Sequence, residues 1–303
     1  MKTTKSKSII VNDYSLDKSL DCLERMGKLF PIVRTGARTC RIFVRHNSTD
    51  YLFEISQCAN IFQVTMLLGS LDYGEFQQMF NKILGMFDFH NENYNKIDAR
   101  AYGAVDSKNL LNLLKGLRII KDISLVNCVI RTIISQQVSL KAASNIVRKF
   151  VEYYGDCLEF EGNCYFQFPT VDYIATNLTI TKLREIGIPL TRAGAIIDLA
   201  NKVNELEKSI EDYSYDELKH ILISVKGIGK WTVEMLGLFY FTDPEIIPVA
   251  DLGLHRAIEY LYDLPERSIS KSNVENITSE WFSNKSLLVY YIWEYWMLIG
   301  EMM

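Results

Sequence analysis

The chain has 303 residues, of which 48% are hydrophobic and 23% charged, which is enough apolar surface for two or three folded domains. Its formal net charge of −4 excludes a strongly basic protein that coats nucleic acid, so any nucleic-acid contact must be a local patch. The six cysteines form no Cys-x-x-Cys pair and none lies beyond Cys164, which argues against zinc ribbons and C-terminal iron–sulfur loops. No apolar run is long enough to span a membrane, so we expect an intracellular, cytoplasmic protein with reduced thiols.

The first hundred residues combine strand and helix signals. Residues 38–68 alternate apolar and polar side chains with many β-branched and aromatic residues, and residues 47–50 supply turn chemistry. Residues 17–29 and 73–87 have helical apolar spacing. The pattern predicts an α+β unit with an antiparallel sheet.

After the polar stretch at residues 90–96 the strand signals mostly stop, and the rest of the chain is predicted to be mainly α-helical. We expect helices at about residues 123–134, 139–154, 171–177, 180–186, 191–207, 214–224, 230–241, 252–262 and 286–302.

The segment at residues 225–235, VKGIGKWTVEM, lies between two of these predicted helices. Gly227 and Gly229 can adopt positive φ values, so a sharp turn there would expose backbone N–H groups. Lys226 and Lys230 add positive charge beside the start of the second helix, where an anion is favoured. The pattern indicates a phosphate-binding helix–hairpin–helix, but a Gly-x-Gly turn alone is also typical of a plain linker between core helices.

Asp251 follows Pro248-Val-Ala and lies 22 residues (251 − 229) after Gly229. It stands where the helix predicted at 252–262 would begin, so one interpretation is an N-cap worth about 1 kcal/mol. A capping carboxylate can also face a cleft. The fixed separation from the hairpin favours that second interpretation.

Several other side chains can either pack or bind a ligand. Trp231 and Met235 lie four residues apart and share a helix face. Flat indoles in the last quarter of the chain can stack on a base or belong to the core; they are Trp231, Trp281, Trp293 and Trp296. Gln136 and Gln137 interrupt two apolar helical runs, with Ser139 placed to cap the next helix.

Five segments resemble, in the same order, the helix–hairpin–helix (HhH-GPD) DNA glycosylases, most closely the branch of 3-methyladenine DNA glycosylase II. They are residues 116–119, 133–139, 187–200, 226–232 and 248–253. The resemblance covers about residues 113–303, and it is faint in the N-terminal domain.

The resemblance implies an α+β N-terminal domain with a small antiparallel sheet and helices, at residues 1–106. A mainly α-helical, two-lobed glycosylase core follows. One lobe would combine residues 107–125 and 245–303, and the other, residues 126–244, would carry the helix–hairpin–helix.

The resemblance also assigns roles. Asp251 matches the catalytic carboxylate. The DNA-binding residues would be Gln137, Lys226, Gly227, Gly229, Lys230 and Thr232. Members that are also lyases have a lysine where this chain has Trp231, so the resemblance implies a monofunctional glycosylase.

The base pocket would include Trp231, Met235, Trp293 and Gln136. Met235 stands where one member has a tyrosine, and Gln137 replaces a wedge leucine. Family hairpins often bind a monovalent cation, Na⁺ or K⁺, through backbone carbonyls that match Ile223, Val225 and Ile228. No cofactor is expected to be required.

We therefore predict a monomeric, nucleoid-associated base excision repair enzyme whose partner is damaged double-stranded DNA. It would flip alkylated purines such as 3-methyladenine out of the duplex and excise them hydrolytically. Two alternatives stay open: a glycosylase for oxidised or deaminated purines, and a non-catalytic helix–hairpin–helix protein that binds damage.

Overall fold

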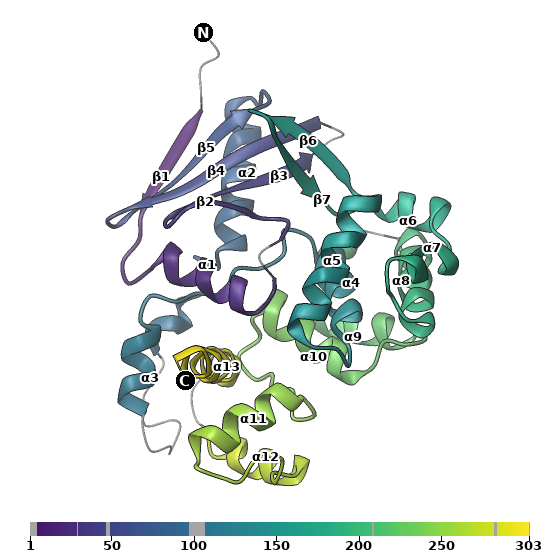
Figure 1. The fold of residues 1–303 in the computed structure, drawn as a ribbon. Helices are drawn as coiled ribbons and strands as arrows, with labels where there is room; N and C mark the ends of the chain where they lie inside the picture. Colours follow the sequence, from purple (N-terminus) through teal and green to yellow (C-terminus); the bar gives the residue numbers. More distant parts are fainter. Residues whose placement is uncertain are drawn as a thin grey trace.

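The computed structural model describes residues 5–28, 30–46, 49–96, 107–207, 209–281 and 284–302. A sheet with its helices occupies one end of the molecule, and the helical lobes lie beneath it (Figure 1). Part of the turn predicted at residues 47–50, namely residues 47 and 48, lies outside the described residues.

The N-terminal sheet has five antiparallel strands in the order β1-β5-β4-β3-β2. The strands are β1 Ser6–Ile10, β2 Val33–Gly36, β3 Thr39–His46, β4 Thr49–Cys58 and β5 Ile61–Leu68. The segment predicted at residues 38–68 forms β3 to β5. The prediction missed β1 and β2, which are short edge strands with little buried surface to impose an apolar pattern.

Side-chain alternation gives the sheet two apolar faces. Ile42 and Phe53 face the core formed with α1 (Leu16–Arg25) and α2 (Tyr73–Met86), while Phe43 faces the opposite side. Figure 1 shows α2 running along one side of the sheet.

A two-stranded hairpin, β6 (Asp156–Phe160) and β7 (Asn163–Gln167), covers part of the opposite face and was not predicted within the mainly α-helical second part. Its turn residues Glu161 and Gly162 have φ values of 51° and 76°, as a two-residue hairpin turn requires. Tyr165 is buried there and its hydroxyl lies 2.9 Å from Nη1 of Arg41. The Glu161-Gly162 pair lies between two segments in which apolar and polar residues alternate, and this pattern is the signal that could have predicted the hairpin.

Every predicted helix is present, with ends shifted by up to five residues. The helices after the sheet are α3 Ser107–Leu114, α4 Leu125–Ser135, α5 Leu140–Tyr154, α6 Val171–Asn177, α7 Ile180–Glu185, α8 Leu190–Asn204, α9 Tyr215–Ile223, α10 Lys230–Leu236, α11 Leu252–Leu261, α12 Lys271–Ser279 and α13 Lys285–Met302. A π-helical turn, Gly237–Phe241, continues α10, and short 3-10 helices occur at Glu92–Lys96 and Ile210–Asp212.

Local side chains explain where many of these helices begin. Hydroxyls and a carboxylate accept the N–H of the third helical residue, as in Ser139, Thr170, Thr179, Ser214, Asp251 and Ser270. The prediction missed α3, which is short, and α12, where only Val274 and Thr278 are buried.

The helical part has two hydrophobic cores that meet at α10. Val233 and Leu236 belong to the core of α4 to α9, whereas Met235 belongs to the core of α3, α11 and α13. The end of α1 joins the second core through Cys22 and Met26. Because α10 serves both cores, the hairpin before it lies at their junction.

Helix α13 is apolar around most of its circumference and is buried between neighbouring elements. Among the helices that the structure describes, none combines the length and apolar content that a membrane span requires.

Candidate active site

A cleft of about 980 Å³ opens where the two lobes and the end of α1 meet. It brings together side chains from distant parts of the chain, including Gln136, Trp231, Met235, Asp251 and Trp293. Each of the residues predicted for the base pocket therefore lines the same space as the predicted catalytic carboxylate.

Asp251 begins α11 and faces the cleft, so both interpretations of this residue hold. Its Oδ1 accepts the N–H of Leu254 at 2.8 Å, and its Oδ2 accepts Nε1–H of Trp231 at 3.0 Å. The preceding turn is fixed by His255, whose ring nitrogen lies 2.9 Å from the carbonyl oxygen of Val249. No ion pair to Asp251 occurs within the described part of the chain, so its oxygens keep free acceptor capacity toward the cleft.

Trp293 forms a wall of the cleft and is 8% exposed. Its ring stacks on Phe239 with a centroid distance of 5.9 Å and an interplanar angle of 11°. Its buried Nε1 has no hydrogen-bond partner among the described residues.

Gly253 explains how α11 and α13 come so close at this wall. A Cβ at that position would lie 2.9 Å from Oδ1 of Asp251 and 3.4 Å from Nε1 of Trp293. A glycine therefore lets the carboxylate and the indole pack together, a requirement that the sequence pattern alone did not indicate.

The two hairpin glycines differ, because only one of them uses the positive φ that both can adopt. Gly227 has a φ of +95°, and a Cβ there would lie 3.1 Å from Cβ of Ala195. Gly229 is extended, with a φ of −110°, and has open space around it. Gly227 is thus required by the fold, whereas Gly229 leaves room for a partner outside the chain.

The predicted phosphate-binding lysines are both exposed. Lys230 also pairs with Glu234 at 3.3 Å, and 78% of the Lys230 side chain is accessible. Burial raises the pKa of Glu234, and the hydrogen bond from Lys230 opposes that shift. Lys226 and Lys230 therefore present two cations beside the open turn at Gly229.

Gln136 joins the end of α4 to the hairpin. Its Nε2 donates to the carbonyl oxygen of Gly227 at 3.0 Å and to Oγ1 of Thr232 at 2.9 Å. Thr232 is buried, so its hydroxyl supports the hairpin from within. Gln137 is exposed at the rim of the cleft. Its φ is positive, at 51°, a backbone conformation that costs free energy and is found at functional sites.

The three residues predicted to offer carbonyls to a cation lie along the hairpin. Ile223 ends α9 and is 54% exposed, while Val225 and Ile228 are buried. The carbonyl of Val225 accepts the N–H of Ile228 at 3.1 Å. Among the described residues there is no group of three or more His, Cys, Asp and Glu side chains that could hold a metal ion.

The cleft contains residues that the sequence analysis did not assign to a site. Lys28 and Phe239 line it, as do Trp296 and Met297 on α13. The spacing of Trp293 and Trp296 places both on one helix face, which is a local signal. Lys28 follows α1 in the N-terminal part, and no local pattern connects it to the cleft.

Comparisons with known proteins agree with this architecture. A family model described as the HhH-GPD superfamily base excision DNA repair protein matches residues 130–284, just over half of the chain. The Bacillus subtilis (strain 168) protein named "Putative DNA-3-methyladenine glycosylase YfjP" is 25% identical over 296 residues, covering 95% of this chain and 98% of the relative. A second protein of that organism, named DNA-3-methyladenine glycosylase, is 29% identical over 181 residues, 59% of each chain.

A solved structure has the same fold. The 3-methyladenine DNA glycosylase from Archaeoglobus fulgidus superposes with a TM-score of 0.77 at 22% identity, covering 94% of this chain and 97% of that one. The matched family model spans the hairpin, Trp231 and Asp251. The chain therefore belongs to the HhH-GPD superfamily of base excision DNA repair proteins.

Proposed function

We propose that this protein is a monofunctional DNA glycosylase that extrudes alkylated purines from duplex DNA and hydrolyses their N-glycosidic bonds. The observation that carries the proposal is the partly exposed carboxylate of Asp251, which lies in a cleft lined by Trp231 and Trp293. The names of the two Bacillus subtilis relatives support alkylated purines as the substrate class.

The chemistry needs little beyond these groups. An N-alkylated purine is already cationic and leaves readily, so protonation of the base is less necessary. As the bond breaks, the sugar becomes oxocarbenium-like, and the ionised Asp251 would stabilise that charge and orient the attacking water. The indole faces favour electron-poor, cationic bases.

The hairpin suits the DNA backbone. Open space at Gly229 lets a phosphate approach the N-terminus of α10, and Lys226 and Lys230 supply charge there. Gln137, exposed at the rim, is placed to enter the gap left by an extruded base, whose extrusion costs a few kcal/mol. Gly229→Asp should weaken binding to all duplexes at least about tenfold, and unchanged binding across a salt titration would exclude this role.

Trp231 occupies the position of the lyase lysine, which supports hydrolysis without strand cleavage. Lys28 is the one lysine that lines the cleft among the described residues, and its ammonium lies over the ring of Phe239. The proposal therefore predicts no covalent trapping of abasic DNA by borohydride.

A monovalent cation, Na⁺ or K⁺, is proposed at the carbonyls of Ile223, Val225 and Ile228. Backbone carbonyls are oxygen ligands of the kind such ions prefer, and each carbonyl has two lone pairs, so the hydrogen bond at Val225 leaves one available. Replacing Na⁺ and K⁺ by tetramethylammonium at constant ionic strength should weaken DNA binding; no change would exclude the ion.

The deciding experiment measures bases released from dimethyl sulfate-treated duplex DNA, with strand breaks scored before and after alkali. Release of methylpurines that leaves uncut, alkali-labile abasic sites is expected. Release only from duplexes with oxidised or deaminated purines would replace the substrate class. Tight binding without release of any base would indicate a damage-binding protein.

A further inference from the structure

We propose that Lys28 is a specificity-determining residue that donates a hydrogen bond to an oxygen at position 6 of the extruded purine. The inference rests on the proposed function, because it concerns a base held in the cleft. It predicts that 6-oxopurines are preferred over 6-aminopurines with the same modification.

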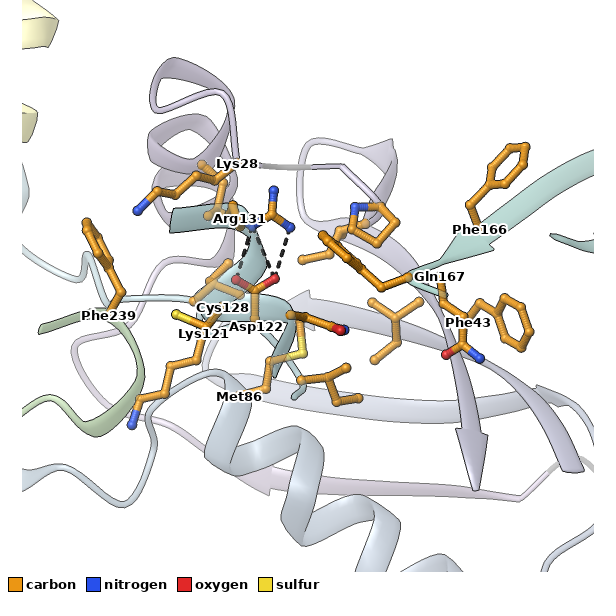
Figure 2. A pocket seen from close by; sticks show the side chains of 18 of the residues that line it. Lys28, Phe43, Met86, Lys121, Asp122, Cys128, Arg131, Phe166, Gln167 and Phe239 are labelled. Carbon is orange, nitrogen blue, oxygen red and sulfur yellow. Dashed lines mark hydrogen bonds and ion pairs between the residues drawn. The ribbon is translucent and has the colours of Figure 1, made fainter. Parts of the chain in front are cut away.

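Lys28 lies at the boundary between two spaces. It lines the cleft and also a small cavity of about 60 Å³ between the sheet domain and α4. Figure 2 shows its side chain turned toward Phe239 and away from the paired Asp122 and Arg131. Its Nζ lies 2.9 Å from the centroid of the Phe239 ring.

A continuous wall joins Lys28 to the catalytic end of the cleft. The ring of Phe239 contacts Nζ of Lys28 and also stacks on Trp293, whose Nε1 packs at Gly253 beside Oδ1 of Asp251. Asp251 acts at the bond from N9 of a purine to its sugar. A base that extends along this wall from Asp251 would present its six-membered ring toward Lys28.

The ammonium group of Lys28 is available to donate hydrogen bonds to a ligand. No hydrogen bond or ion pair to its ammonium occurs within the residues that the structure describes. Asp122, the carboxylate that lines the small cavity together with Lys28, is held by Nε and Nη2 of Arg131 at 3.0 and 2.9 Å. Lys28 is partly buried and lines the cleft, so an acceptor supplied by a ligand there would gain a hydrogen bond to a charged donor.

The surroundings set the charge of Lys28. Burial lowers the pKa of Lys28 to about 8, with Arg131 acting in the same direction and Cys128, Asp122 and Cys22 opposing it. At pH 7 the ammonium form therefore still predominates. That form has three donors and no acceptor, so it can pair with a 6-oxo group but not with a 6-amino group.

The first experiment follows tryptophan fluorescence during titration with free hypoxanthine and free adenine, which differ at position 6. Trp231 and Trp293 report base binding in the cleft without any need for catalysis. We expect wild type to bind hypoxanthine about tenfold more tightly than adenine, as a hydrogen bond to a charged donor provides. Lys28→Met should abolish the preference.

The second experiment compares release of 7-methylguanine and 3-methyladenine from methylated duplex DNA. Both bases are cationic, so repulsion by an ammonium affects both and cancels in the ratio of their rates. Lys28→Met should lower the ratio of 7-methylguanine to 3-methyladenine release about tenfold. An unchanged ratio would overturn the inference.

Two further variants separate this role from a structural one. Lys28→Gln keeps a polar side chain that can either donate or accept, so it should bind both bases without preference. Lys149→Met changes an exposed lysine on α5 and should retain the wild-type preference. Retention of the preference in both Lys28→Met and Lys28→Gln, or its absence from wild type, would refute the role of Lys28. If wild type releases no methylpurine, the proposed function fails while the fluorescence titration still decides the role of Lys28.

Discussion

The two ends of helix α11 carry carboxylates with opposite environments. Asp251, at the N-terminus, accepts one N–H on each oxygen and borders the cleft. Glu259, two turns further on, is 2% exposed, pairs with Arg256, and accepts backbone N–H groups of Arg267 and Ile269, both at 2.9 Å.

The difference separates the carboxylate proposed to be catalytic, Asp251, from a structural one, Glu259. Burial by itself would raise the pKa of Glu259, but the amide of Ile269, the side chain of Arg256 and the amide of Arg267 outweigh it and hold the pKa at about 2. These bonds use the acceptor capacity of Glu259 to order the loop after α11. Asp251 keeps capacity for a substrate because its partners are fewer and one side is open.

The largest loss of activity is expected from a substitution of Asp251, at the end of α11 that borders the cleft. Asp251→Asn preserves a good N-cap, so the protein should fold normally. Loss of the negative charge should lower the rate of base release by about 100- to 1000-fold, the range for removing one preorganised stabilising group. Single-turnover release from methylated duplex DNA measures this. Near-normal release by a folded variant would show that Asp251 is not the catalytic carboxylate.

The matched change at the other end should affect stability instead. Glu259→Gln places an amide N–H₂ against backbone donors and should lower the free energy of unfolding by about 2 kcal/mol. Urea unfolding measures the change. Base release per folded molecule should stay within about twofold of wild type. A larger loss would show that Glu259 also contributes to catalysis and is not purely structural.

The pH dependence sharpens the same test. The pKa of Glu259 is lowered from 4.5 to about 2, so its ionised form stabilises the fold above pH 4.5, and this contribution disappears as the pH falls toward 2. The difference in unfolding free energy between wild type and Glu259→Gln should therefore shrink over that interval. A constant difference would show that Glu259 does not titrate in this way.

The smallest effect concerns the indole that orients Asp251. Trp231→Phe retains an aromatic wall but removes the N–H that Oδ2 accepts at 3.0 Å. The rate of base release should fall about tenfold, while release of cationic bases continues. Trp296→Phe is the control and should change the rate less, because this indole lines the same cleft but, among the described residues, makes no hydrogen bond to Asp251. Equal losses would assign the effect to general pocket packing.

Much of the helical fold was predictable because its signals are local. Apolar spacing and capping residues marked α4 to α11 and α13 close to their observed ends. Edge strands and the β6–β7 hairpin were missed, since their pairing depends on the sheet, where Tyr165 is buried against residues of β3 and β4. Helix α12 was missed because few of its residues are buried.

By itself, the sequence determined the hairpin, the position of Trp231 and the capping Asp251, because each is encoded within a few neighbouring residues. Only the tertiary structure decided that Gly227 serves the fold while Gly229 stays open, and that Gly253 lets Asp251 and Trp293 pack together. It alone brought Lys28 to the far end of the same wall. Such contacts join segments distant in the chain, and no local periodicity records which side chains will meet when separate cores pack.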